Sequence, residues 1–372
     1  MSNDNKFLGL DVKQYIYLLS ALVILTAISL LGWFSWQFYQ KSEISFGPIT
    51  KDKKEQTKQN KNKDCNKRRK LDGFCIDDTD FEQNPKLAAI MIENHVDSRP
   101  PSGLAQARIV YEAPVEGNIS RFLAIYTENQ EVGQVGPVRS ARPYFVDWTR
   151  EYGDATYMHV GGSPTALDYI EQIGLNDLDQ FSNNWYYWRS KQRSKPHNVY
   201  TSSKLWSKAL ENNKNSYQDK KYDSWKFQDR EQCSNSSTTS SAKDCITSIA
   251  TTFASPGYSA TWQFNTTSGK YKRYQSGHLH QDKSGKVVTA ENVIIQHVDT
   301  KVVDNVGRLD MSTIGSGEVE IYVEGKKITG TWQKEAKSDR TKFLNEQGEQ
   351  IVLEPGTTWI TVVNDKATAE EK

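Results

Sequence analysis

The sequence predicts an α+β protein: an N-terminal α/β three-layer domain and then a mostly β C-terminal domain, after an N-terminal transmembrane helix. Three observations predict this architecture. Residues 15–34 carry no charge, residues 85–215 alternate strand-like with helix-like segments, and residues 222–365 hold short β-rich runs without a long helix. The 372 residues suffice for about two ordinary domains. Apolar residues make up 36% of the chain and aromatic residues 11%, which excludes a wholly disordered protein.

The uncharged stretch is long enough to cross a bilayer as a helix, and aromatic residues stand at both of its ends. A cleaved signal peptide is the alternative. The apolar run is longer than a signal core, and no small-residue cleavage site follows it. We therefore expect an uncleaved transmembrane helix over residues 15–39, after a short cytoplasmic tail over residues 1–14.

Two lines of reasoning disagree about orientation. Lysines are more frequent after the span than before it, which would place the C-terminal part in the cytoplasm. The four cysteines form two local pairs in polar sequence, which indicates disulfides and an oxidising compartment; the pairs are Cys65 with Cys75 and Cys233 with Cys245. Zinc would require tighter C-x-x-C spacing. Because long domains cross membranes largely regardless of charge, we expect a single-pass protein of the cell membrane with extracytoplasmic C-terminal domains.

Residues 40–84 are predicted to form a flexible basic tether that includes a small cysteine-closed loop, CNKRRKLDGFC. The basic run in this loop could touch anionic polymers or phospholipid. A solvated run of charges is the interpretation that we favour.

The first domain, residues 85–215, is predicted from three strands and three helices. The expected strands are 86–94, 121–127 and 155–160, and the expected helices are 143–152, 164–173 and 204–212. The second helix has clear boundaries, because Ser163 can cap it, Pro164 suits its first turn and Gly174 suits its end.

The second domain, residues 222–365, is predicted to be mostly β. Short alternating or β-rich runs cover residues 258–264, 317–323, 327–332 and 357–363. Turn residues separate these runs at Glu324–Gly325 and Gln347–Gly348.

The segment GPVRSARP, residues 136–143, is the most informative about function. It places Arg139, Ser140 and Arg142 at the start of a helix, where acidic residues are usually preferred. Two guanidinium groups, the helix dipole and backbone N–H groups would together bind a phosphate or a carboxylate. The alternative is that the arginines pair with internal carboxylates, of which Glu112, Glu116 and Asp147 are candidates.

A second helix start, HVGGSP, holds His159 and Ser163 around two glycines. Glycines before a capped helix allow a ligand to approach the backbone. If both helices flank one sheet, the two helix starts should meet at the same sheet edge, where open α/β sheets bind ligands.

Other polar residues lie within apolar sequence, and for each of them a structural hydrogen bond is the interpretation that we favour; they are Glu93, His95, Glu112, Glu116, Arg121 and His197. His278, His280 and Asp282 alternate along a predicted strand and could bind a metal, although a polar solvent-facing strand is favoured. The sequence contains no Walker loop, HExxH, GxSxG or dinucleotide fingerprint.

Long motifs then resemble one family. IMIENH, SRPPSGLAQARIVYEAPVEGNISRFLAIY, VGPVRSARPYFVDW, HVGGSPTAL, KPHNVYTS, YKRYQSGHLHQD, ENVIIQH, GTWQK and LEPGTTWI are similar to the YerB-like lipoprotein family. The resemblance covers about residues 85–365 and implies two domains and an extracytoplasmic, envelope-anchored protein without a settled activity. The chain departs from the family in its anchor, because a membrane helix stands where the family has a lipidated cysteine. It departs again at Asn118, where the family favours glycine.

A shorter likeness is to the LytR–CpsA–Psr enzymes, which transfer polymers from polyprenyl diphosphate. RFLAIY, VGPVRSAR and HVGGSPTAL follow the same order as that family's strand, arginine-bearing loop and glycine turn. The likeness implies a phosphotransferase with Mg²⁺ to offset diphosphate charge and a carboxylate, Glu116 or Asp147, as ligand or base.

The functional hypothesis is a membrane-anchored envelope module that binds an anionic wall polymer or polyprenyl phosphate without a cofactor. The expected ligand-binding residues are Arg121, Arg139, Ser140, Arg142, His159, Ser163, His197 and Glu116. The alternatives are the phosphotransferase and a scaffold that docks envelope proteins through the aromatic-rich β domain. A net charge of +1 gives no reason to expect nucleic acid as a partner.

Overall fold

The computed structural model describes residues 25–27, 29, 30, 32, 33, 65, 67–76, 83–212, 221–229, 245–252, 255–364 and 368–371. Residues 1–63 and residues 64–372 are two separate units, and the second is compact. Among the described residues, no helix has the length and apolar character to cross a bilayer. Most of residues 15–39 lies outside the described part of the chain, as does the tail before it, so the membrane helix stays a prediction.

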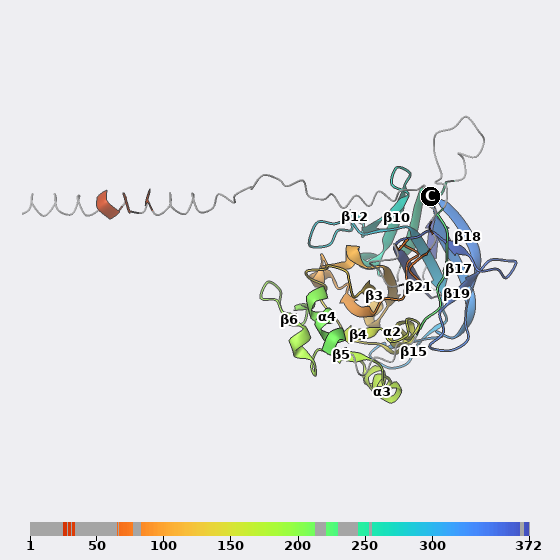
Figure 1. Cartoon of the computed structure of the whole chain (residues 1–372), viewed down its shortest axis with the longest axis horizontal. Helices are drawn as coiled ribbons and strands as arrows, with labels where there is room; N and C mark the ends of the chain where they lie inside the picture. Colours follow the sequence, from red (N-terminus) through yellow and green to blue (C-terminus); the bar gives the residue numbers. More distant parts are fainter. Residues whose placement is uncertain are drawn as a thin grey trace, which may run out of the picture. The chain divides into compact units, whose positions relative to one another are not determined.

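A ten-stranded mixed sheet runs through the folded unit, residues 64–372. The helices of this unit lie beside β4 and β5, and strands β17, β18 and β19 lie at the other end of the sheet (Figure 1). In spatial order the strands are β19 (Lys342–Leu344), β18 (Lys326–Lys334), β17 (Gly315–Val323), β14 (Asn292–His297), β21 (Thr358–Val363), β2 (Ile109–Pro114), β3 (Ser120–Thr127), β1 (Leu87–Glu93), β4 (Thr156–His159) and β5 (Asp177–Asp179).

The sheet joins the two predicted domains. Strand β2 pairs in parallel with β21, with Ile109 opposite Thr358 and Glu112 opposite Thr361. Both strands are buried along their whole length, as expected for strands that are covered on both faces. The fold is therefore mixed α+β, as predicted. The C-terminal region, however, also completes the sheet begun by the N-terminal region.

The remaining strands form a second sheet and three short pairs. The second sheet contains β9 (Ser248–Thr252), β10 (Ala260–Asn265), β11 (Lys270–Gln275), β12 (His278–Leu279), β13 (Thr289–Ala290) and β22 (Thr368–Glu371). The short pairs are β6 (Trp188–Arg189) with β7 (Val199–Tyr200), β8 (Lys226–Phe227) with β20 (Val352–Leu353), and β15 (Thr300–Val302) with β16 (Leu309–Met311). Buried residues alternate with more exposed ones along β10 and β11, so these strands cover the core with one face.

The three predicted helices are confirmed as α2 (Pro143–Arg150), α3 (Pro164–Ile173) and α4 (Ser203–Asn212). Ser163 caps α3 through its side chain, Pro164 occupies the first turn, and Gly174 ends the helix in the left-handed conformation. The predicted turn at Glu324–Gly325 is also confirmed, since both residues have positive φ between β17 and β18.

Two hydrophobic cores occupy the two faces of the large sheet. Residues that alternate along β1 divide between them, with Ala89 and Met91 in one core and Ala88 and Ile90 in the other. The first core takes its helical side chains from α2 and α3. The second takes them from α4 and adds apolar residues of the six-stranded sheet. The sheet is therefore covered on both faces.

A buried ionic cluster joins the two halves of the chain. Glu112 of β2 accepts two hydrogen bonds from Arg273 of β11, at 2.8 and 2.9 Å, and both side chains are fully buried. Ser120 and Trp359 donate to the same carboxylate, at 2.9 and 3.1 Å. The charge on Glu112 is thus matched and its lone pairs are used.

The cysteine-closed loop packs against the folded unit. Cys65 and Cys75 form a disulfide, Leu71 is fully buried, and Arg69 donates to Asp72 at 2.8 Å. The prediction that this loop is a solvated run of charges is wrong for Arg69, because the side chain of Asp72 neutralises it inside the fold. Cys245 is disulfide-bonded as well. Its predicted partner, Cys233, lies outside the described residues.

Candidate functional site

The arginine-bearing loop and the glycine turn meet at one edge of the large sheet. Strands β1, β4 and β5 are parallel, so their carboxyl ends share that edge. The segment after Gly136 passes between β1 and β4. Arg139 N donates to Met91 O at 3.0 Å, and Ala141 N donates to Gly161 O at 2.9 Å. The predicted meeting of the two helix starts at one sheet edge is confirmed. We call Arg121, Arg139 and Arg142 together the arginine edge.

Two of these arginines pair with carboxylates. Arg139 Nε donates to Glu93 Oε1 at 2.9 Å, and Arg142 donates two hydrogen bonds to Glu116, at 2.5 and 2.7 Å. Pairing with internal carboxylates was the alternative to an anion site, and the structure shows it for Arg139 and Arg142. The predicted pairing with Glu116 is confirmed. Glu112 pairs with Arg273 instead, and Asp147 accepts from Tyr169 and Thr313.

Arg121 differs from its two neighbours. It is the second residue of β3, and its side chain donates to the backbone oxygen of Ser140 at 2.6 Å, the one side-chain hydrogen bond that it makes among the described residues. Burial and the positive charges of Arg142 and Arg139 lower the pKa of Arg121 to about 10, although Tyr144 and Glu116 partly oppose them. At neutral pH the side chain is therefore a buried cation that pairs with no carboxylate in the described part of the chain.

The arginine edge also has more positive than negative side chains. Among the described residues, the three guanidinium groups have two carboxylate partners, because Arg139 pairs with Glu93 and Arg142 with Glu116. Burial alone would raise the pKa of Glu116, but the hydrogen bond and charge of Arg142 lower that pKa below its usual value of 4.5. Within the described chain, no side chain caps α2, whose N-cap residue is Arg142. The arrangement retains excess positive charge at a helix start.

His159 is fully buried at the end of β4. Its Nε2 lies 2.5 Å from Asp177 Oδ1, and its Nδ1 lies 2.8 Å from the oxygen of Gly161. Burial opposes protonation, but the hydrogen bond and charge of Asp177 raise the pKa of His159 above 6.5. These contacts fix the turn that precedes α3. Ser163 is used by the same turn as the helix cap, so both residues support the edge from inside the fold.

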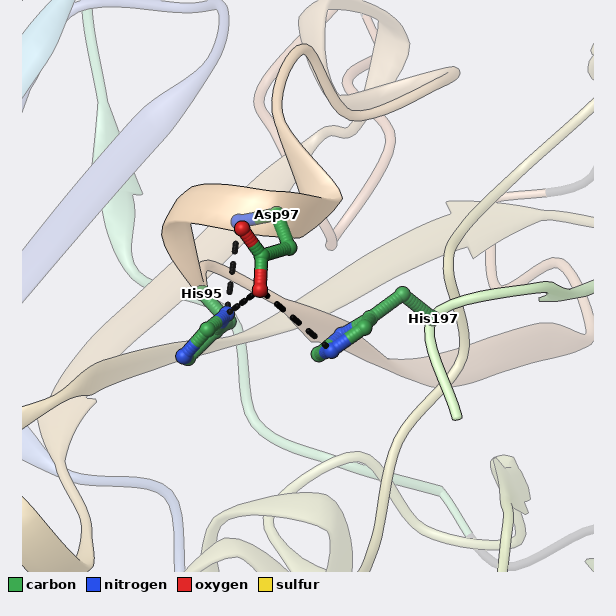
Figure 2. Close-up of side chains that lie close together, drawn as sticks. All are labelled: His95, Asp97 and His197. Carbon is green, nitrogen blue, oxygen red and sulfur yellow. Dashed lines mark hydrogen bonds and ion pairs between the residues drawn. The ribbon is translucent and has the colours of Figure 1, made fainter. Parts of the chain in front are cut away.

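His197 comes from the loop between β6 and β7, and it contacts the edge through a shared carboxylate. Its Nδ1 lies 2.9 Å from Glu93 Oε2, while the other oxygen of Glu93 accepts from Arg139. On the outer side, His197 stacks on His95 at 4.9 Å between ring centroids, beside Asp97. His95, Asp97 and His197 form the one cluster of potential metal ligands found among the described residues (Figure 2). Asp97 is a residue that sequence reasoning missed; its signal is the H-x-D spacing directly after a buried strand.

Four other candidates, Asp147, His278, His280 and Asp282, are placed away from the edge. Asp147 accepts from Tyr169 and Thr313, each at 2.7 Å, and contacts none of the arginine-edge side chains in the described structure. His278 is exposed, but His280 and Asp282 are buried. The prediction of a polar solvent-facing strand is therefore wrong for the last two. Arg273 Nη1 donates to His280 Nδ1 at 2.7 Å.

The comparisons with known proteins agree on one family. Residues 73–218 match the N-terminal domain, and residues 249–360 the C-terminal domain, of a protein family of unknown function, DUF3048. The chain belongs to the DUF3048 family. It is 31% identical over 299 residues to the Bacillus subtilis (strain 168) protein named "Putative lipoprotein YerB", a match that covers 79% of this chain and 86% of that protein. The predicted resemblance to YerB-like proteins is thereby confirmed.

A solved structure supports the fold of this DUF3048 protein. The crystal structure of YerB from Bacillus subtilis superposes with a TM-score of 0.67 at 27% identity, covering 82% of this chain and 99% of that one. Almost the whole of the YerB structure thus has a counterpart here.

The DUF3048 chain also has a cavity of about 530 Å³ at the far ends of α2 and α3, opposite the arginine edge. Its charged lining residues are Arg150, Lys221 and Arg340 with Asp154, Asp223 and Asp339. Its lining thus has three basic and three acidic residues, whereas the arginine edge has more basic than acidic ones.

Proposed function

We propose that this DUF3048 protein is a membrane-anchored, extracytoplasmic protein of the cell envelope that binds an anionic envelope ligand at the arginine edge. The placement is supported by the uncharged segment over residues 15–34, the disulfide between Cys65 and Cys75, and a relative named as a lipoprotein. Ligand chemistry follows from the edge itself.

One observation carries the ligand assignment: in the described part of the chain, two of the three guanidinium groups pair with a carboxylate and Arg121 does not, beside a helix start that no described side chain caps. A phosphate would supply the missing negative charge to Arg121 and accept hydrogen bonds from guanidinium groups. Glu116 is more accessible than the buried carboxylates, since 21% of its side chain is exposed. In this proposal, Glu116 accepts the hydrogen bonds of Arg142 in the free protein. The phosphate of a wall polymer or of a polyprenyl carrier then displaces the Glu116 carboxylate from Arg142.

The displacement can be tested with two opposite substitutions in the full-length protein in detergent micelles. Glu116→Gln removes the competing carboxylate, so affinity for polyprenyl phosphate or a phosphate-containing wall polymer should rise. Arg142→Ala removes a donor, so affinity should fall about tenfold or more. Binding is measured by fluorescence anisotropy with a labelled ligand of each type, which distinguishes the lipid carrier from the polymer.

Matched controls separate a local effect from a general effect of charge. Arg150→Ala lies at the other end of α2, and Asp168→Asn makes the same charge change as Glu116→Gln on the exposed side of α3. Both controls should bind as the unaltered protein does. Equal affinity in Arg142→Ala and Glu116→Gln would show that the ion pair is structural and would refute the anion site.

The two alternatives have less support from the described residues. A phosphotransferase would use Glu116 or Asp147 with Mg²⁺, but Asp147 is committed to Tyr169 and Thr313. A scaffold would use the aromatic residues of the β-rich region, but Trp262, Trp332 and Trp359 are buried in the cores. Release of product from a polyprenyl-diphosphate analogue would favour the enzyme over the binding module.

A further inference from the structure

Two imidazoles and one carboxylate converge outside the arginine edge. Figure 2 shows the carboxylate of Asp97 directed toward the rings of His95 and His197. Asp97 Oδ2 lies 3.5 Å from His95 Nδ1 and 4.0 Å from His197 Nε2. Ligands about 2.0–2.1 Å from a tetrahedral zinc ion are themselves about 3.3 Å apart. The three ligand atoms here all lie within 4.8 Å of one another, so binding a metal would draw them slightly closer together.

The fold selects the nitrogen of His197 that faces Asp97. Glu93 Oε2 lies 2.9 Å from His197 Nδ1, and a carboxylate can only accept there, so Nδ1 carries the proton. The lone pair of the imidazole is then on Nε2, toward Asp97. A carboxylate that holds the far nitrogen of a histidine in this way is the common support for a metal-binding imidazole. Because the side chain of Glu93 is only 5% exposed, this hydrogen bond holds the His197 ring in place.

His95 and Asp97 come from one short segment and can adjust. His95 directly precedes the 3₁₀ turn Val96–Ser98, which carries Asp97, and the backbone of His95 is held by Ser98. The ring of His95 is 31% exposed, and its Nδ1 accepts a long hydrogen bond of 3.3 Å from Asp97 N. A metal must lie in the plane of each ring that binds it. The stacked His95 ring would therefore turn about its side-chain bonds, which its exposure permits.

We propose that His95, Asp97 and His197 bind a divalent transition-metal ion of the kind that zinc represents. Two imidazoles with one carboxylate suit zinc, nickel, cobalt or iron rather than calcium or magnesium. Three protein ligands leave at least one coordination position for water or another ligand, and Asp97, 69% exposed, places that position at the surface. The site is independent of the proposed anion binding, although Glu93 supports His197 as well as Arg139.

The competing explanation is that the stack of His95 on His197 only packs two loops together. Zinc titration of the full-length protein in detergent micelles, with retained metal measured after dialysis, separates these explanations. The unaltered protein should retain one equivalent of zinc. Cobalt bound in its place should show the visible absorption of a four- or five-coordinate ion.

His95→Ala, Asp97→Asn and His197→Ala should each weaken zinc binding about tenfold or more. Asp97→Asn is the decisive variant, because its exposed side chain can change without disturbing the fold. His278→Ala is the matched control, since it removes an exposed histidine elsewhere and should leave binding unchanged. Absence of retained zinc in the unaltered protein, or retention that all three variants preserve, would overturn the proposal. If the unaltered protein retained zinc but did not bind the phosphate-containing ligands, only the proposed anion site would be refuted.

Discussion

Glu112 and Glu116 stand four residues apart in the sequence, and each accepts two hydrogen bonds from an arginine, yet their surroundings differ. Glu112 and Arg273 are fully buried, and the carboxylate also accepts from Ser120 and Trp359. Glu116 and Arg142 remain 21% and 12% exposed, and Arg142 supplies the only hydrogen bonds that the described side chains give to Glu116. A buried ion pair whose carboxylate has all its hydrogen bonds made inside the protein is suited to stabilising the fold. A partly hydrated pair beside a surplus cation is suited to exchanging its partner.

The buried pair should show the largest effect on stability. Arg273→Met leaves Glu112 as an uncompensated charge in the core, so we expect a loss of about 3–5 kcal/mol in the free energy of unfolding. Denaturant unfolding of the full chain, followed by tryptophan fluorescence, measures this loss. Adding Glu112→Gln removes the stranded charge and should recover part of it, since the two residues are coupled.

Arg308→Ala is the surface control for this measurement, because Arg308 and Asp304 form an ion pair with 37% and 31% of their side chains exposed. It should leave the unfolding transition where it is in the unaltered protein. If Arg273→Met cost no more than that control, the contrast between the two kinds of pair would be lost.

His159 tests an intermediate case, a buried ring held by a partly exposed carboxylate. Its pKa is raised in the folded protein, so protonated His159 stabilises the fold below its unfolded pKa of about 6.5. This stabilisation is lost as the pH rises through the higher, folded pKa. Asp177→Asn should lower the folded pKa and flatten that dependence. NMR titration of the His159 ring and unfolding at several pH values between 5 and 9 measure both effects.

A matched titration of exposed His278 provides the reference for His159. If the pKa of His159 did not change in Asp177→Asn, Asp177 would not be the group that holds the proton.

The partly exposed pair, Arg142 with Glu116, should affect stability less than the two cases above. Arg142→Ala is expected to cost about 1 kcal/mol or less, because water can hydrate the Glu116 carboxylate that it leaves. The pKa of Glu116 is lowered, so its contribution is present above the usual value of 4.5 and is lost as the pH falls through the folded pKa. Glu116→Gln should remove that acid-dependent part.

Acid unfolding of Glu116→Gln beside the unaltered chain measures the contribution directly. If Arg142→Ala lost as much stability as Arg273→Met, both ion pairs would serve to stabilise the fold. The proposed exchange of Glu116 for a ligand would then lose its support.

Local features of the fold were predictable to within a few residues. The cap at Ser163, the proline after it and Gly174 set the limits of α3, because capping depends only on neighbouring residues. The alternation of apolar residues identified β10 and β17 in the same way. The meeting of the arginine loop with the glycine turn was predictable too, since parallel strands bring their carboxyl ends to one edge.

The amino-acid sequence was therefore sufficient to predict the three α-helices, the edge where the arginines lie and seven strands, which are β1, β3, β4, β10, β17, β18 and β21; the central strands β2 and β14 were not predicted. The pairing of each arginine with a particular carboxylate, by contrast, depends on how distant segments pack. Arg139 pairs with a glutamate 46 residues away, and Arg273 with one 161 residues away. The tertiary structure also decided that β2 and β21 share a sheet and that His95, Asp97 and His197 converge. Propensity and periodicity act over a few residues along the chain, whereas these pairings arise from packing between distant segments, to which no local pattern responds.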